Sequence, residues 1–275
     1  MRWALHRFAY LRNMISDTAR SIFRLVFFLW AVMVLANSAQ AQPFFNQKKE
    51  VLYRIHYGFI EAGELLCFSD TNYHFVENKK CRKMEIIGKT TGAASAFANI
   101  HDRWISYVDS ATGLPFRFIR ELQENNYSKE ELTEFDRVNN IVIVSTKTEQ
   151  DEYNMASYKI PNDAHDMVSA YLALNAYPLE TLSENNTFGF NVFVEDSTYS
   201  FTVKYLGKET IKTKYGKKEA FKISPIMPNN SVFSKEEAIL CWISADAERI
   251  PLKLRAKLTV GAVEMELEHY SVYER

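Results

Sequence analysis

The chain has 275 residues, of which 47% are hydrophobic and 24% are charged, and its formal net charge is −1 at pH 7. This near-neutral balance lacks the strongly basic character that nucleic-acid binding requires, so no nucleic-acid partner is expected. Beyond residue 41 no run of 18 apolar residues occurs, so we expect no retained transmembrane segment.

The N-terminal segment has the order of parts that defines a secretory signal peptide. Arg20 and Arg24 precede an uncharged stretch of twelve residues, 25–36, and a box of small residues follows it. The apolar stretch is shorter than the roughly 20 residues that cross a bilayer, although a retained anchor is the alternative. We therefore predict a signal peptide over 1–41 that is cleaved near Ala41, which places the protein in the periplasm or outside the cell.

Two features of this segment bear on the mature protein. Counted from Met1 the signal is longer than usual, so Met14 is an alternative start. Position 42 is not a cysteine, so we expect no lipid anchor at the cleavage site. The remaining residues, 42–275, are sufficient for a single β-rich domain.

Alternation of apolar and polar residues, which is typical of half-buried strands, dominates the first half of the mature chain. The first strand is expected at 51–59, with its apolar side chains on one inward face. A turn or bulge at 61–64 precedes the returning strand at 65–68. Further strands are expected at 82–90, 100–109, 114–122, 131–137 and 141–148, with a hairpin turn at 138–140.

One segment breaks the alternation. Residues 164–176 place apolar side chains at i, i+4 and i+7, as on one face of a helix. Asp163 is a suitable N-cap for this helix, and Pro178 is a suitable stop. We therefore predict one helix near the middle of the chain.

The second half of the chain returns to alternation. Strands are expected at 190–194, 199–205, 220–224 and 250–258, with a turn at 215–218. After Gly261 the apolar positions change phase by one residue. Such a change at a glycine marks a tight turn or a bulge, and we predict a turn that closes a terminal hairpin.

These elements predict a mainly β protein. The connections are too short for crossovers between parallel strands, so the sheet is expected to be antiparallel. A single helix cannot cover so large a sheet, and the sheet must therefore curve onto itself. We predict a strongly curved half-barrel or open barrel with the central helix against its concave side, and a two-sheet sandwich is the alternative.

The cysteines allow one disulfide. Cys67 ends one expected strand and Cys81 begins the next across a polar loop, so this pair is the candidate bridge in an oxidising compartment. Closing such a loop would stabilise the fold by about 3 kcal/mol. Two free, buried thiols are the alternative. No cysteine or histidine spacing matches a zinc site, so neither a metal nor a cofactor is expected.

Catalytic motifs are absent from the sequence, which leaves two sets of candidate residues. Aromatic side chains on the inward phases could bind an apolar ligand, with a dry core as the alternative; they are Tyr53, Tyr57, Phe59, Trp104, Phe116, Phe118 and Trp242. Polar residues near turns could bind a ligand, with capping of turns and ordinary ion pairs as the alternative; they are Asp102, Arg103, Asp166, Ser169, Asp246 and Arg249.

Several of these residues lie in motifs that resemble those of the bacterial DUF3108 family. The motifs lie at 53–64, at 102–118, at 166–171 and at 242–261, and the resemblance covers roughly residues 50–273. The resemblance implies an exported protein with a curved β structure, loosely linked to periplasmic carriers of lipoproteins. It implies no activity and supplies no catalytic residues.

We interpret the chain as an exported, non-catalytic binding module for an apolar or amphipathic ligand, such as a lipid. The alternative is a structural or assembly partner of another protein in the cell envelope. A hydrolase is less favoured, and its enzymatic site would require Asp102, Asp166, Asp246 and Arg249 to converge in one cleft.

Overall fold

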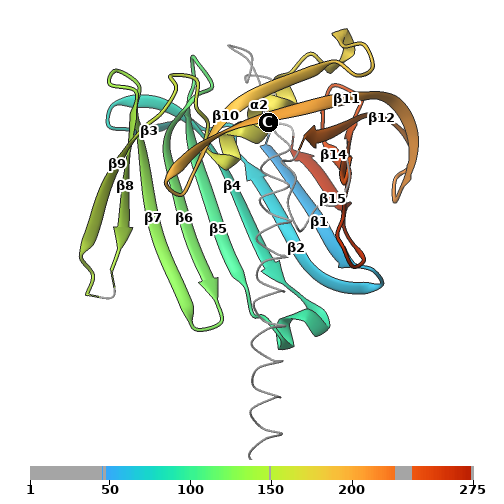
Figure 1. The fold of residues 1–275 in the computed structure, drawn as a ribbon, viewed down its shortest axis with the longest axis horizontal. Helices are drawn as coiled ribbons and strands as arrows, with labels where there is room; N and C mark the ends of the chain where they lie inside the picture. The colour runs from blue at the N-terminus through green and yellow to red at the C-terminus, as the bar shows by residue number, and fades with distance from the viewer. Residues whose placement is uncertain (1–44, 46–47, 149, 227–236, 274–275) are drawn as a thin grey trace, which may run out of the picture.

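The computed structural model describes residues 45, 48–148, 150–226 and 237–273 (Figure 1). The predicted signal peptide and its cleavage position lie outside these residues, as does Met14.

The described strands form one antiparallel sheet (Figure 1). Its first part consists of β1 (Lys48–Tyr57), β2 (Ile60–Ser69), β3 (His74–Val76), β4 (Lys79–Thr90), β5 (His101–Asp109), β6 (Pro115–Glu124), β7 (Tyr127–Asp136), β8 (Ile141–Lys147) and β9 (Tyr153–Lys159). Its second part consists of β10 (Thr187–Val194), β11 (Ser197–Thr213), β12 (Gly216–Ile226), β13 (Ile239–Ser244), β14 (Pro251–Lys257) and β15 (Ala262–Tyr273). The helices are α2 (Met167–Ala176) and the short 3₁₀ turns η2 (Gly92–Ala96) and η3 (Leu179–Thr181).

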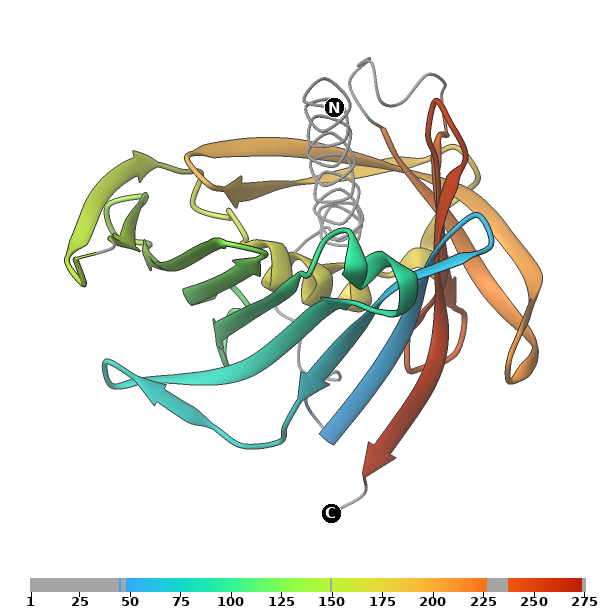
Figure 2. The same cartoon turned by 90° about the horizontal axis from the view of Figure 1, so that it is seen from below.

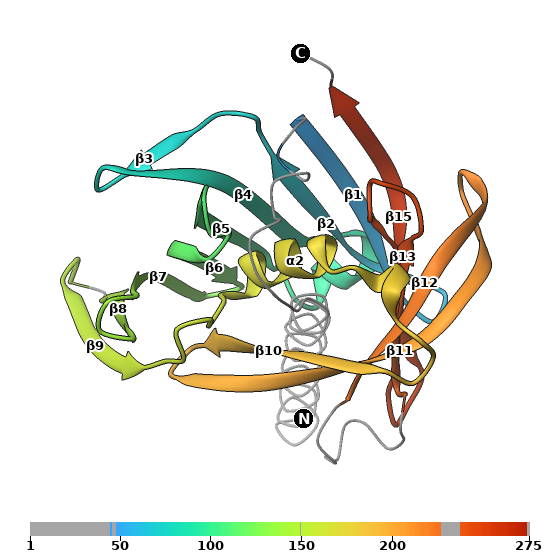
Figure 3. The same cartoon turned by 90° about the horizontal axis from the view of Figure 1, so that it is seen from above.

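The spatial order of the strands joins the two ends of the chain. It runs from β10 through β15 to β1, then through β2 and β4 to β9, and β3 pairs only with β4. Pairing between β1 and β15 therefore links the two parts of the sheet. Figures 2 and 3 show the sheet curling around α2, with β4 and β5 on one side of the helix and β10 and β11 on the other. The predicted curved, open sheet is confirmed, and the chain does not form the alternative sandwich.

The predicted turn or bulge at 61–64 is a bulge, and the first hairpin turns earlier in the chain. The register pairs Ile55 with Gly63 and His56 with Glu61, so Ala62 is the extra residue of a β-bulge. The turn itself lies at 58–59, where Gly58 has a φ of +59° that favours glycine. Phe59 therefore lies at the tip of the hairpin with 97% of its surface exposed, and its predicted place on the inward face is wrong.

The helix also begins later than predicted. Its N-cap is Asp166, and the predicted N-cap Asp163 is wrong. The Asp166 carboxylate accepts hydrogen bonds from the backbone N–H groups of Val168 and Ser169, while Ser169 Oγ accepts one from the Asp166 N–H. This reciprocal capping box satisfies donors that a buried helix start would otherwise leave unpaired. The helix ends at Ala176, two residues before a proline, as predicted.

Helix α2 fills one end of the concave side and connects the two parts of the sheet. Most of its side chains are buried, and they pack against β4, β5 and β10. At its start, Ser106 Oγ of β5 donates a 2.6 Å hydrogen bond to Asp166 Oδ2. At its end, Asn175 Nδ2 donates to the carbonyl oxygen of Arg249, 2.8 Å away, in the β13–β14 connection.

The predicted Cys67–Cys81 disulfide is wrong, because Cys67, Cys81 and Cys241 are all free and buried. Cys67 lies opposite Ile86, and Cys81 is five residues further along the same strand β4. Five residues of strand span about 16 Å. A disulfide needs Cα atoms within about 7 Å. Burial raises the pKa of each of the three thiols, so they stay protonated at neutral pH.

Candidate functional site

The candidate aromatic residues do not gather on one surface. Tyr53, Trp104 and Phe118 are buried. Ser106 of β5 faces α2, so Trp104, two residues away, shares this concave face. Trp242 donates a hydrogen bond from Nε1 to Glu209 and lies beneath the ammonium group of Lys222.

The remaining aromatic candidates lie elsewhere. Phe116 packs beneath Lys79, whose Nζ is 4.6 Å from the ring centre. Tyr57 donates a hydrogen bond to the carbonyl oxygen of Val260 at the end of the barrel, close to the exposed Phe59. A single aromatic binding surface made by all seven residues is therefore wrong.

The strand register arranges the concave side chains in rows that change character across the sheet. One row runs from Cys67 through Ile86 and Trp104 to Arg120 and Glu131. All of these side chains are buried. The row is thus apolar on β2 and β4 and charged on β6 and β7.

The neighbouring row is uncharged from β1 to β4 and has one acidic side chain on β5. Tyr53 lies opposite Leu65, Leu65 opposite Gly88, and Gly88 opposite Asp102. Asp102 Oδ1 accepts a 3.0 Å hydrogen bond from the Gln123 N–H, beside Leu122 of β6. We call these two rows the concave-face site.

Arg120 is the centre of charge in the concave-face site. Its guanidinium lies 3.4 Å from Glu131 Oε1 and 3.3 Å from Glu195 Oε1. Lys129 Nζ lies 2.5 Å from the other oxygen of Glu131. Glu195 comes from the turn between β10 and β11, so Arg120 holds that hairpin across the concave side. A buried charge of this kind is retained only when it is paired, because desolvation costs several kcal/mol.

A second polar cluster lies at the start of α2. Burial raises the pKa of Asp166 to about 6 and lowers the pKa of His165 to about 3, the latter with help from the nearby Arg137 charge. Arg137 donates hydrogen bonds to the carbonyl oxygens of Ala164 and Pro115. His165 Nδ1 lies 3.3 Å from Ser169 Oγ.

The types of residue in this cluster match a catalytic triad, but the bonding between them does not. Both carboxylate oxygens of Asp166 accept from Ser106 Oγ and backbone amides, and no described hydrogen bond joins Asp166 to His165. A triad needs the carboxylate to orient the imidazole. The cluster therefore fastens α2 to β5 and to the β7–β8 turn.

The other polar candidates also fasten neighbouring elements. Arg103 forms ion pairs with Glu85 of β4 and Glu121 of β6. Asp246 accepts hydrogen bonds from Ser244 Oγ and the Glu248 N–H within the β13–β14 connection.

Arg249 completes the proposed hydrolase set, and its guanidinium pairs with Glu180 of η3 at the surface. Asp102 and Ser106, which contacts Asp166, are four residues apart on β5, or about 13 Å. The fold thus places Asp102, Asp166, Asp246 and Arg249 at separate positions. The convergent cleft that the hydrolase hypothesis required is not formed by the described residues.

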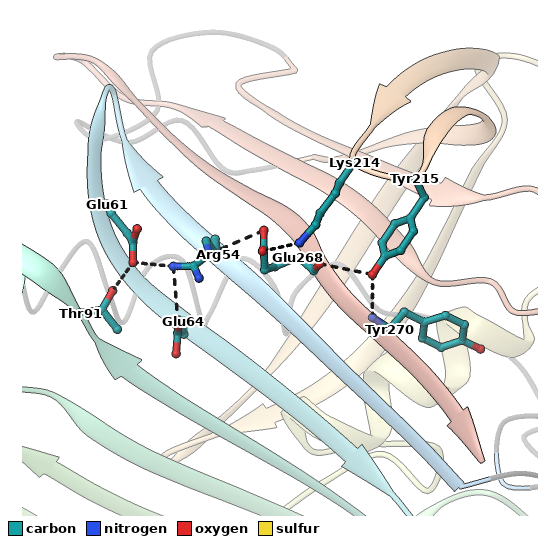
Figure 4. Close-up of polar contacts among 8 residues, drawn as sticks. All are labelled: Arg54, Glu61, Glu64, Thr91, Lys214, Tyr215, Glu268 and Tyr270. Atoms are coloured by element: carbon teal, nitrogen blue, oxygen red, sulfur yellow. Dashed lines mark hydrogen bonds and ion pairs between the residues drawn. The ribbon is translucent and has the colours of Figure 1, made fainter.

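A third cluster lies on the convex side (Figure 4). Arg54 Nη1 lies 2.7 Å from Glu61 Oε1 and 3.6 Å from Glu64 Oε1, and Arg54 Nε is 3.7 Å from Glu268 Oε2. Tyr215, from the turn between β11 and β12, donates from its hydroxyl to the Glu268 carbonyl oxygen. These contacts hold the first hairpin and the β11–β12 hairpin against β15.

The residues predicted from the sequence do not include Arg120, Glu131, Ser106, Arg137 and Glu195. A signal for Arg120 was present, because it shares the phase of the buried Phe118 and Leu122. A charged residue on an inward phase is costly to bury and therefore marks a site. No such signal marks Glu195, which the fold brings to Arg120 from 75 residues away.

The fold and these clusters define a class: an open antiparallel barrel that is partly filled by one helix and is charged on part of its concave face. Within this class, the chain belongs to the DUF3108 family, a family of unknown function whose model matches residues 52–268. No match was found among curated protein sequences.

Solved structures are similar to this chain at low sequence identity. A β-barrel-like protein with the domain of unknown function DUF1849 from Brucella abortus is 8% identical, with a TM-score of 0.53, and the match covers 83% of this chain and 98% of that one. A DUF1089 family protein from Pseudomonas aeruginosa is 8% identical, with a TM-score of 0.33 and coverage of 68% and 87%. The first of these supports the barrel-like fold alone.

A solved structure described as that of an exported protein matches at lower similarity. A candidate exported protein with a YmcC-like fold from Bacteroides fragilis is 8% identical, with a TM-score of 0.28 and coverage of 82% and 96%. In the part of the chain that the structure describes, none of the helices has the length and apolar character needed to span a bilayer.

Proposed function

We propose that this protein is an exported, non-catalytic binding module of the cell envelope that holds an amphipathic ligand, such as a lipid, on its concave face. The observation that carries the proposal is the change from apolar to charged side chains along the row from Cys67 to Glu131 of the concave-face site. A ligand with an apolar chain and a polar head matches such a surface, because each part of it meets side chains of its own kind.

The charged part of the site favours an anionic head group. Arg120 is buried, whereas its partner Glu195 has 65% of its side chain exposed at the tip of the β10–β11 hairpin. A ligand carboxylate or phosphate can take the place of Glu195 on the guanidinium without leaving Arg120 unpaired. Because these side chains are buried, the apolar chain must displace neighbouring core side chains to lie along Trp104, Ile86 and Leu65.

Two tryptophans on different faces allow a direct test. In the exported chain that begins after Ala41, Trp104 and Trp242 are the only tryptophans. The variant Trp242→Phe reports on the concave face through Trp104, and the matched variant Trp104→Phe reports on Trp242. A fatty acid brominated along its chain quenches only a tryptophan that it contacts. We expect saturable quenching in Trp242→Phe and almost none in Trp104→Phe.

The outcome depends on where the quenching occurs. Quenching that is equal in the two variants, or that never saturates, would contradict the proposal. A third variant, Arg120→Met in the Trp242→Phe background, tests the head group. It should weaken binding of the fatty acid about tenfold or more, which is the loss expected when a charge-assisted hydrogen bond is removed. Binding that is unchanged by this substitution would remove Arg120 from the site.

A further inference from the structure

Four turns at one end of the barrel contain no charged residue. They occupy the lower end of the sheet in Figure 1, and we call them the uncharged rim: residues 57–60, 90–100, 125–128 and 258–263. With 24% of its residues charged, the chain would on average place a charge at about one position in four. The rim is therefore an unusual part of this sequence.

Hydrogen bonds connect the four turns into one surface. The Gly58 N–H donates to the Ala262 carbonyl oxygen at 3.1 Å. Thr91 of the η2 segment donates from its backbone N–H to the Ala62 carbonyl oxygen at 3.3 Å. The Asn125 N–H donates to the carbonyl oxygen of Asn99 at 2.7 Å. The turns are thus neighbours in space and cannot move independently.

Large apolar side chains project from this rim. Phe59 is 97% exposed, Val260 is 74% exposed and Phe97 is 55% exposed. Single exposed apolar residues are common on protein surfaces, but a cluster on adjoining turns marks a contact surface. Ile60, beside Phe59, adds to the same cluster.

The opposite end of the barrel has the contrary character. Each of its tight connections carries charged residues, among them Asp70, Glu77, Asp109, Asp136 and Glu248. Charged connections border the rim on both sides: the β8–β9 connection lies beyond the β6–β7 turn, and Glu237 precedes Ala238, whose carbonyl oxygen accepts from the Lys257 N–H. The lack of charge is thus a property of these four adjoining turns, not of turns in general.

Two clusters of charge behind the rim are internally paired. Arg54 is surrounded by Glu61, Glu64 and Glu268, as Figure 4 shows. Lys253 lies 2.8 Å from Glu264 and 2.7 Å from Glu266. Arg54 and Lys253 thus add no basic field to the rim, and the rim itself contains no charge that a nonpolar medium would exclude.

We propose that the uncharged rim docks the protein on a lipid bilayer, with Phe59, Phe97 and Val260 inserted among the acyl chains near the headgroups. The charge match favours this occupant, because a bilayer made of zwitterionic lipid offers a neutral, apolar layer below its surface. Separate projecting tips also suit a fluid layer, whereas a protein partner would need a surface shaped to all of them. This inference stands on the rim alone and does not require the concave-face ligand.

The test is binding to phosphatidylcholine vesicles, measured by flotation of the exported chain. Phe59→Asp introduces a charge at the most exposed tip and should weaken vesicle binding about tenfold or more, since burial of a phenylalanine side chain is lost. Val138→Asp is the matched control, because Val138 is 89% exposed on the β7–β8 turn at the charged end. It should bind as the wild-type protein does.

Other outcomes overturn the proposal. The proposal is wrong if the wild-type protein does not float with phosphatidylcholine vesicles. It is also wrong if Phe59→Asp floats as well as wild type, or if Phe59→Asp and Val138→Asp lose vesicle binding equally. Binding that appears only when anionic lipid is added also contradicts it, because the rim carries no basic residue. If the rim binds a protein partner and not lipid, the wild-type protein will not float with the vesicles. Quenching of Trp104 by the brominated fatty acid should be unchanged when Phe59→Asp is added to Trp242→Phe, so failure here is distinct from failure of the concave-face proposal.

Discussion

The carboxylate of Asp166 lies buried at the start of α2, between Ser106 Oγ and two backbone amides. Burial raises its pKa to about 6, whereas the same group in an unfolded chain titrates near 3.8. Between these pH values the folded protein holds a proton that the unfolded chain has released. Protein stability due to this group therefore falls as the pH rises from about 4 to about 6, by about 3 kcal/mol in total.

The variant Asp166→Asn should lose this pH dependence while keeping an acceptor for the cap. We expect its free energy of unfolding, minus that of wild type, to rise by about 3 kcal/mol between pH 4 and pH 7. Urea unfolding at a series of pH values measures the difference. The pKa of His165 is lowered to about 3, so His165 destabilises the fold below about pH 6.5. This effect of His165 is the same in both proteins, so it cancels in the difference between their free energies of unfolding. If the free energies of unfolding of the two proteins change with pH in parallel, Asp166 is ionised throughout this pH range and the prediction is wrong.

Single residues of the site were predictable only where the chain pattern carried their signal. Asp166 and Ser169 stood out because an acid and a hydroxyl began the one helical segment, and they do form its cap. The roles of Asp102 and Arg103 as fasteners between strands depend on register, which alternation alone does not supply. Glu195 depends on a long-range contact and has no local signal.

Among the elements, the β11–β12 hairpin docks on β15 at an irregular point. The register of β1 with β15 pairs Leu52 with His269 and Tyr53 with Leu267, so Glu268 is an extra residue. Tyr215 supplies the missing partners, since its hydroxyl donates to the Glu268 carbonyl oxygen at 3.3 Å and accepts from the Tyr270 N–H at 3.2 Å. A side chain from a neighbouring hairpin thus completes the bulge (Figure 4).

Removing that hydroxyl with Tyr215→Phe should leave both backbone groups without their partner. We expect the Tyr270 amide to exchange with solvent about fivefold faster, which corresponds to about 1 kcal/mol. Hydrogen exchange followed by NMR measures it. Tyr199→Phe is the control, because Tyr199 has the same 46% exposure and no described hydrogen bond of its hydroxyl. If the Tyr270 amide exchanges equally fast in both variants, the hairpin does not stabilise the bulge.

Elements with one buried face were the predictable ones. β14 alternates between buried and less buried positions, and its turn at Gly261 follows as predicted. β9 was missed because it is almost wholly exposed at one end of the strand order, and β13 because nearly all of its side chains are buried. Neither strand shows the alternation of apolar and polar residues, with a period of two, on which the strand predictions were based. The helix start was misplaced because Asp163 and Asp166 are both suitable N-cap residues in the sequence, whereas His165 pairs with β10 and so lies outside the helix.

At the scale of the whole molecule, the expectation of many strands and a single helix was enough to predict a sheet that curves onto itself. It was not enough to predict that β1 would join β15 and so leave β9 and β10 at the two edges. That closure depends on the register of residues more than 200 positions apart, such as Ile55 with Met265. This closure also packs both parts of the sheet against the single helix α2.

The dependence of both parts on α2 predicts one cooperative unfolding transition. Trp104 reports on the first part of the sheet and Trp242 on the second. In Trp242→Phe and Trp104→Phe, the remaining tryptophan should lose its native fluorescence at the same urea concentration as the far-ultraviolet circular dichroism of that variant. Leu172, which is fully buried on α2, provides the decisive change, because Leu172→Ala should cost about 2–5 kcal/mol. Both tryptophan transitions should then move together, since the helix is shared. A shift of one transition alone would mean that the chain folds as two independent units.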